Sequence, residues 1–292
     1  MRFADIGQQL RAYRLESGLR AEEIAARLGV SRAALYRYEK GEVIKLDTIR
    51  RLAELLKISP LSLLGIGVEY FSRPVAFQER LRQVEEQADQ ILMVGGALCY
   101  QVSTDAFEGA LAEAWTEAAE AGPDRVPARS MADQALGLLS ARKKLHQQRR
   151  PNIIGILSEA ALRRFLQDGV AAGIPVSERT RAHCLAAALA EAESIASMME
   201  SVPIGLQLGL TAGPEPSGSF IVLRGRDRAH VVGSPFAPDA PPTAGIGVAM
   251  ITAADEAISV HQRVAETAWR DALKGAAAAA RVRELIATVR PD

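Results

Sequence analysis

The first 66 residues place apolar side chains at helical spacing in five short groups. Residues three or four positions apart lie on one face of a helix, so each group indicates a helix with one buried face. Gly18, Gly29 and Gly41 separate the first four groups. Ser31 and Ser59 precede later groups as helix caps. The pattern predicts a compact bundle of five short helices with these apolar groups: Ile6, Leu10, Tyr13 and Leu15; Ile24, Ala25 and Leu28; Ala34, Leu35 and Tyr38; Ile49, Leu52, Ala53 and Leu56; Leu61, Leu63 and Leu64.

After residue 76 the chain alternates between amphipathic helices and short apolar runs. Residues 77–90 have helical spacing, the run "ILMVGG" reads as a strand, and Thr104 caps another helical segment. The alternation continues through "PNIIGILSE" and through four short apolar runs between residues 202 and 252. A final helix is predicted over residues 253–289. This pattern predicts an α/β or α+β domain in which helices cover a mixed sheet of about five to six strands.

The change of pattern divides the chain into three parts. We expect residues 1–66 to form a helical head, residues 67–76 a linker, and residues 77–292 a larger body. The head has twelve Lys and Arg residues against eight Asp and Glu residues, whereas the whole chain of 292 residues has 35 of each kind. A basic head on an acidic body favours binding of a polyanion by the head.

Composition is that of an ordinary globular protein, with 48% hydrophobic and 24% charged residues. No apolar run reaches the roughly 18 residues of a membrane span. The amphipathic start with Asp5 differs from a signal sequence, so we expect a cytoplasmic protein without a membrane partner. Cys99 and Cys184 are far apart and outside any CxxC spacing, which predicts small buried residues rather than a disulfide or a zinc site.

The stretch "EEIAARLGVSRAALYRYEKG", residues 22–41, has the order of a helix-turn-helix. A turn containing Gly29 joins two short helices, Ser31 caps the second helix, and Gly41 ends it. On these residues the segment 5–65 resembles the XRE, or lambda-repressor-like, family. The resemblance implies a head that binds double-stranded DNA and a recognition helix that starts at Ser31.

A helix that starts at Ser31 turns its apolar residues toward the bundle and its polar residues outward. Arginine donates two hydrogen bonds to guanine and a methyl group contacts thymine, which predicts Arg32, Ala33 and Arg37 as base-reading residues. Tyr36 has two interpretations, because its hydroxyl can reach a phosphate or base edge while its ring can instead pack on the head. Other positions near the helix ends are predicted to contact phosphates: Ser31, Lys40 and Lys45.

The resemblance implies an ion pair between Arg14 of the first helix and Glu39 at the end of the recognition helix. One departure concerns the start of the second helix, where the family has Ser or Thr followed by Gln. This chain has Arg20 followed by Ala21. We expect the charge of Arg20 to replace the phosphate contact that the missing residues would make.

The body contains "RRPNIIGILSEAALRRFLQDG" and "VPIGLQLGLTAGPEPSGSFIVLRGRDRAHVV". On these stretches residues 142–235 resemble a domain of unassigned biochemical role that follows XRE-type heads in many bacterial regulators. The resemblance implies sensing or oligomerisation. Open α/β sheets bind small molecules beyond the carboxyl ends of their strands. This rule predicts the following effector-binding candidates, together with the loop 211–219: Gly95, Gly96, Cys99, Tyr100, Ser158 and Glu159.

Several segments of the body leave two interpretations open. "MVGGAL" is either an anion cradle or a tight turn from a strand to a helix. The basic run 142–150 is either a solvated helix face or an auxiliary contact to DNA or another anion. The alanine-rich end is either a dimerisation helix or a helix packed closely against the sheet of its own domain. The chain has no nucleophile elbow, phosphate-binding loop or paired histidines, so we expect no enzyme, no metal and no cofactor.

The function predicted from these features is a sequence-specific transcriptional regulator, most simply a repressor. We expect a homodimer on a palindromic operator, with a body that dimerises and senses a small-molecule effector. An antitoxin-like or phage-type repressor controlled by a protein partner is the first alternative. An enzyme with a DNA-binding head is the second.

Overall fold

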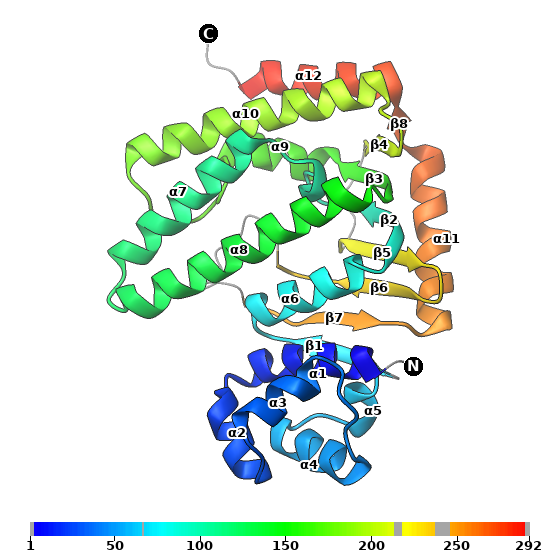
Figure 1. The fold of residues 1–292 in the computed structure, drawn as a ribbon. Coiled ribbons are helices and arrows are strands. Elements are labelled where there is room, and N and C mark those ends of the chain that lie inside the picture. The colour runs from blue at the N-terminus through cyan, green and yellow to red at the C-terminus, as the bar shows by residue number, and fades with distance from the viewer. Residues whose placement is uncertain (1–2, 66, 213–217, 237–245, 290–292) are drawn as a thin grey trace.

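The chain folds into a helical head followed by a larger body built on one mixed sheet (Figure 1). The computed structural model describes residues 3–65, 67–212, 218–236 and 246–289. Within these ranges no helix is long and apolar enough to cross a membrane. The architecture confirms the predicted fold class, a small helical bundle joined to a mixed sheet covered by helices.

The head is a bundle of five short helices around an apolar core. Leu10, Ile24, Leu35 and Leu52 come from four different helices and are fully buried. α2 ends at Gly29, whose φ of 71° lies in the left-handed region that favours glycine. The helices of the head are α1 (Phe3–Ser17), α2 (Ala21–Leu28), α3 (Arg32–Glu39), α4 (Leu46–Leu56) and α5 (Pro60–Leu63).

Eight strands form the sheet of the body in the order β1-β7-β6-β5-β2-β3-β4-β8. β2, β3 and β4 pair in parallel, and the other neighbours are antiparallel. The sequence predicts six of these strands and misses β1 and the two-residue β8. The bounds are β1 (Val68–Phe71), β2 (Ala88–Val94), β3 (Asn152–Ser158), β4 (Leu206–Thr211), β5 (Phe220–Gly225), β6 (Ala229–Gly233), β7 (Ala249–Thr252) and β8 (Leu273–Lys274).

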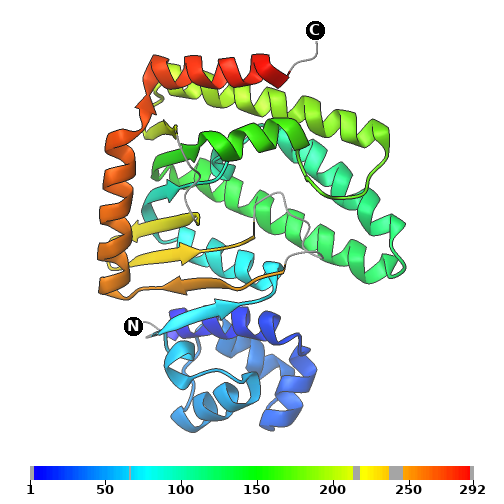
Figure 2. The same cartoon turned by 180° about the vertical axis from the view of Figure 1, so that it is seen from behind.

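Helices cover both faces of the sheet. α11 packs on Val94 and Ile156 at one face, and Figures 1 and 2 show it running across the strands. Met93, the neighbour of Val94, belongs to the main core on the opposite face, since successive strand residues point to opposite sides. The helices of the body are α6 (Pro74–Glu85), the short 3-10 turn η1 (Tyr100–Val102), α7 (Asp105–Ala121), α8 (Arg125–Arg149), α9 (Glu159–Asp168), α10 (Glu178–Ser201), α11 (Asp255–Asp271) and α12 (Gly275–Val289).

The helix predicted over residues 253–289 is two helices, α11 and α12. The edge strand β8 interrupts it, and Gly275 turns the chain at a φ of 56°. α12 then packs along α10, with Ala278 and Ala279 fully buried. The alanine-rich end therefore packs within this chain, mainly on α10 rather than on the sheet as predicted.

Residues 67–76, which the pattern marks as a linker, contain β1 and the start of α6. β1 pairs with β7 at the edge of the sheet, and α6 begins at Pro74. Glu16 of α1 accepts hydrogen bonds from the backbone N–H groups of Ser72 and Arg73 at 2.7 and 3.0 Å. The head is thus joined to the body by paired backbone and by direct contacts from α1.

A buried ion pair connects α6 with α8. Arg142 donates from Nε and Nη2 to the carboxylate of Glu85 at 2.7 and 2.8 Å. Its Nη1 donates to Oε1 of Gln78 at 2.6 Å. The side chains of Arg142 and Glu85 are each 3% exposed. Loss of one partner would leave an uncompensated charge away from water, which is far more costly than loss of a surface pair.

We expect Glu85→Gln to lower the free energy of unfolding by about 3–5 kcal/mol, the usual cost of removing one partner of a buried ion pair. Urea denaturation of the full chain measures this change. Glu86→Gln is the matched control, because the neighbouring Glu86 is half exposed and contacts Arg82 at 3.4 Å. Its effect should stay within about 0.5 kcal/mol. Equal stability of the two variants would contradict this interpretation of the pair.

Candidate nucleic-acid interface

The outward face of α3 carries four exposed side chains. Leu35 is fully buried, and Ala34 and Tyr38 are half-buried, so the helix packs on the head along one side. The exposed set agrees with the orientation that helical periodicity predicts. It consists of Arg32, Ala33, Tyr36 and Arg37.

Arg32 is positioned by two neighbours. Its Nη1 lies 2.7 Å from Oε1 of Glu22 in α2. Its Nη2 donates to the Tyr36 hydroxyl at 3.2 Å, and the guanidinium carbon lies 5.3 Å from the centre of the Tyr36 ring. In this structure Tyr36 therefore orients Arg32, an arrangement that neither of the two interpretations from sequence contains.

Arg37 has a similar acidic partner. Its Nε lies 2.7 Å from Oε2 of Glu42, and both side chains are largely exposed. An exposed ion pair contributes about 0–1 kcal/mol. Arg32 and Arg37 can therefore exchange a carboxylate for a phosphate or a base edge with little loss of energy.

The phosphate candidates lie near the ends of α3 and α4. Oγ of Ser31 accepts a hydrogen bond from the N–H of Ala34 at 3.1 Å, so Ser31 caps α3 as predicted. Lys40 follows the last residue of α3, and Lys45 precedes the first residue of α4. Both lysines are exposed. They flank α3 at its carboxyl side.

The start of α2 is capped in a way that the sequence reasoning missed. Arg20 makes no side-chain cap hydrogen bond. Its own N–H donates to Oε2 of Glu23 at 3.1 Å, so Glu23 supplies one half of a capping box. An acidic residue three positions after the N-cap residue is the sequence pattern that indicates this half of a capping box. The side chain of Arg20 is exposed at the head surface.

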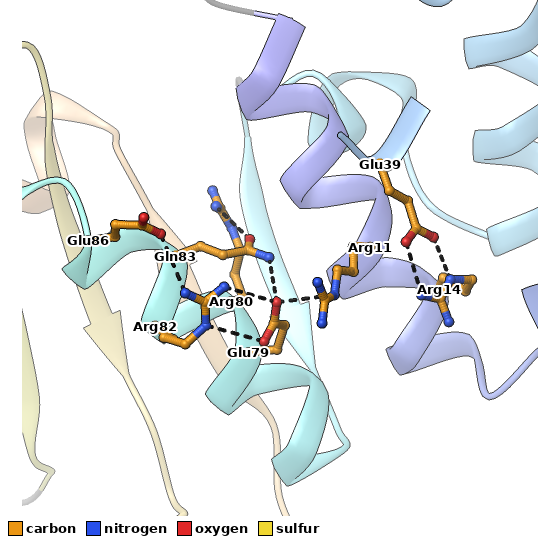
Figure 3. Close-up of polar contacts among 8 residues, drawn as sticks. All are labelled: Arg11, Arg14, Glu39, Glu79, Arg80, Arg82, Gln83 and Glu86. Carbon is orange, nitrogen blue, oxygen red and sulfur yellow. Dashed lines mark hydrogen bonds and ion pairs between the residues drawn. The ribbon is translucent and has the colours of Figure 1, made fainter. Parts of the chain in front are cut away.

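Arg14 and Glu39, which the family resemblance pairs, contact each other through two hydrogen bonds. Nε and Nη2 of Arg14 donate to the two carboxylate oxygens of Glu39 at 2.5 and 3.1 Å (Figure 3). Glu39 is 6% and Arg14 15% exposed in their side chains. These hydrogen bonds raise the pKa of Arg14 above its usual value. The two-bond geometry sets the orientation of the end of α3 relative to α1.

A cavity of about 470 Å³ lies at the carboxyl end of β2, between β5, β6, α6 and α9. Of the predicted effector residues, Gly95, Gly96 and Tyr100 line it, and so does Ser219 from the predicted loop 211–219. Residues 213–217 of that loop lie outside the described residues. The rule that ligands bind beyond the carboxyl ends of strands thus leads to a real cavity in this fold.

Three of the predicted effector residues do not line the cavity. The Cys99 thiol is buried and donates to Oε1 of Gln101 at 3.4 Å, and burial raises its pKa to about 12. Ser158 caps α9 through the N–H of Ala161 at 3.3 Å. Glu159 accepts hydrogen bonds from Arg281 of α12, which lower its pKa. Hydrogen bonds within the fold engage all three side chains, and their role in effector binding stays a prediction.

The basic run 142–150 is neither wholly a solvated face nor a free anion site. Arg142 is bound to Glu85 inside the body. Lys143 is also mostly buried and contacts carboxylates of α7 at 3.1 and 3.3 Å. Helical periodicity alone did not separate these two buried residues from the more exposed remainder of the run. Across the described part of the chain, no group of three or more His, Cys, Asp and Glu residues is arranged to hold a metal ion.

Comparison with known proteins gives one family and one structural likeness. A family described as a helix-turn-helix domain matches residues 5–63. These residues form a helix-turn-helix domain. No curated protein matches the chain. Among solved structures, the chain is similar to TrmBL2, an archaeal chromatin protein whose structure is described as showing a novel mode of DNA binding. The identity is 13% and the TM-score 0.33, with 78% of this chain and 62% of that chain covered.

The helix-turn-helix domain presents acidic residues beside its outward arginines. Glu22 lies next to Arg32 and Glu42 next to Arg37. A carboxylate at such a position competes with phosphate for the guanidinium and repels the DNA backbone. The two glutamates therefore reduce the positive charge that the outward face of α3 presents to DNA.

We expect Glu22→Gln to raise the affinity of the full chain for a fluorescently labelled DNA duplex by about two- to fivefold, as suits an exposed ion pair. The reason is that Arg32 no longer has to leave a carboxylate. Fluorescence anisotropy titrations at low and moderate salt measure the change. Glu284→Gln serves as the control, since Glu284 forms a comparable exposed pair with Arg281 in α12. Weaker binding by Glu22→Gln, or an equal gain in both variants, would contradict this role of Glu22.

Proposed function

We propose that the chain is a sequence-specific DNA-binding transcriptional regulator of the XRE type, acting as a repressor in the cytoplasm. It acts by binding rather than by catalysis, and α3 is its recognition helix in the major groove. The observation that carries the proposal is the exposed face of α3 within a helix-turn-helix domain. Arginines at both ends of this short helix flank a methyl group, with Ser31, Lys40 and Lys45 around them.

The contacts on this face divide into two kinds. Arg32, Ala33 and Arg37 are exposed on the outward face of α3, and we assign them to sequence reading. Arg20, Lys40 and Lys45 lie at helix ends around α3, and we assign them to phosphates, which position the helix without reading sequence. Ser31 belongs with the phosphate group through the N-terminus of α3. Tyr36 acts through Arg32 by holding its guanidinium.

A single helix-turn-helix domain reads one half-site. Two recognition helices related by a two-fold axis read half-sites about 34 Å apart along the DNA, and this geometry favours a homodimer on a palindromic operator. We propose that the body provides the dimer contact. The body also holds the cavity at the end of β2, and we propose that it senses a small-molecule effector there.

We expect Arg32→Ala to lose about 1–3 kcal/mol of binding free energy on a preferred site while its binding to random DNA stays unchanged. The preferred site is obtained by selection from a random duplex library with the full chain. Lys45→Ala should weaken binding to both DNAs alike and lower the slope of log affinity against log salt by about 0.9. Anisotropy titrations over a salt series measure both variants.

The comparison between the two variants decides the assignment. Equal losses on selected and random DNA for Arg32→Ala would remove Arg32 from the base-reading set. Enrichment of no sequence in the selection would argue against a sequence-specific regulator altogether. A stoichiometric protein that co-purifies with the chain and blocks DNA binding would favour control by a protein partner.

A further inference from the structure

The cavity at the end of β2 has the size of a small-molecule site. Its volume of about 470 Å³ lies within the range usual for such sites. Most of its wall is apolar, with Phe77 and Leu81 from α6, Met93 from β2, Phe165 from α9 and Phe236 after β6. A Cβ added at Gly96, directly after β2, would meet no atom within 4 Å. The space beside Gly96 in the cavity wall is therefore unfilled.

The charged groups of the cavity are balanced. Arg142 lines the cavity, but both carboxylate oxygens of Glu85 accept from its guanidinium. At the more exposed part of the wall Arg164 and Asp168 contribute one charge of each sign. A charged ligand would meet no unbalanced charge to offset its loss of hydration. The lining therefore favours an uncharged molecule.

One polar side chain in the wall is oriented by the buried ion pair. Gln78 lines the cavity, and its amide oxygen accepts from Nη1 of Arg142 at 2.6 Å. The amide nitrogen carries two further hydrogens that can be donated to an acceptor oxygen of a ligand. The hydroxyl of Tyr100, also in the wall, donates to Glu108 at 3.1 Å. Gln78 thus fits a ligand with a carbonyl or ether oxygen.

The helix that carries Gln78 also touches the head. The next residue, Glu79, is almost fully buried and lies 3.2 Å from Nε of Arg11 in α1 (Figure 3). One turn further along α1, Arg14 binds Glu39, the last residue of α3. Residues 77–79 of α6 therefore connect the wall of the cavity with the helix that orients the recognition helix.

We propose that this cavity binds an uncharged, mainly apolar small molecule with a hydrogen-bond acceptor, and that its occupancy changes DNA binding through α6 and α1. The ligand is recognised by the apolar wall and by the amide of Gln78. A shift of α6 moves Glu79 relative to Arg11 and so changes the position of α1 and α3. The effect on DNA rests on the DNA binding given under the proposed function, whereas the ligand site does not depend on DNA binding.

The ligand site is tested with Nile red, an uncharged apolar dye with a carbonyl oxygen, and the full chain. We expect saturable binding with blue-shifted emission, and a loss of affinity of about tenfold or more in Ala172→Trp, because Ala172 lies exposed in the cavity wall. Ala106→Trp, at an exposed position of α7 outside the wall, is the matched control and should bind as the parent chain does. The anionic dye anilinonaphthalene sulfonate should bind about tenfold more weakly than Nile red.

Three results would overturn the site. They are the absence of saturable Nile red binding, equal affinity of Ala172→Trp and the parent chain, and preferential binding of the anionic dye. Circular dichroism of each variant shows whether it is folded. All these measurements contain no DNA, so their failure would remove the proposed effector site and leave the proposed DNA binding standing.

The coupling is tested by measuring the affinity for the selected duplex with and without saturating Nile red. We expect the ratio of the two affinities to be about 5- to 150-fold in the parent chain, the range of ordinary allosteric coupling. Arg11→Gln should bring the ratio close to one while leaving Nile red affinity unchanged, since Arg11 is about half exposed and lies outside the cavity. Arg50→Gln, an exposed arginine of α4, is the control that keeps the ratio of the parent chain.

A ratio of one in the parent chain, or an unchanged ratio in Arg11→Gln, would overturn the coupling through α6 and α1. If no duplex is selected and bound at all, the proposed function fails, and Nile red binding still decides the ligand site. The ratio of the two affinities measures the coupling free energy between the cavity and the DNA-binding face directly, whereas the closeness of the residues between them does not.

Discussion

The buried carboxylate of Glu69 joins the two parts of the chain. It lies on β1, and Arg80 of α6 donates to it from Nε and Nη2 at 2.7 and 2.8 Å. Gln9 of α1 donates to it at 3.2 Å. Glu69 and Arg80 are about 5% exposed, and a charge in such a place is tolerated only with its partners in position. Glu69 therefore links the head, the edge strand and α6 through direct contacts.

This constraint gives α6 its central position. The same helix carries Glu79 toward the head, Arg80 toward β1, and Glu85 toward α8. Tyr13 of the head also stacks on Phe71 of β1, with ring centres 5.7 Å apart. Because these contacts set the position of the head on the body, a rearrangement around α6 changes the position of α1. A flexible linker would have separated the two parts.

Prediction from the sequence succeeded where the pattern is local. The five helices of the head, the Ser31 cap and the outward side of α3 follow from helical spacing and cap chemistry within single short helices. Prediction failed where a residue's partner lies far along the chain. Arg142 pairs with Glu85 across 57 positions and Glu159 with Arg281 across 122. No local pattern distinguishes such residues from solvated charges.

The sequence by itself determined that a helical head with an outward arginine face precedes a mixed sheet covered by helices, because periodicity and turn residues are short-range properties. Only the tertiary structure decided that the predicted linker 67–76 contains an edge strand and the start of α6. It also decided which predicted effector residues meet at a cavity and that Tyr36 holds Arg32. Each of these depends on distances between residues that are separate in sequence, and burial and pairing of charges fix those distances only in the folded chain.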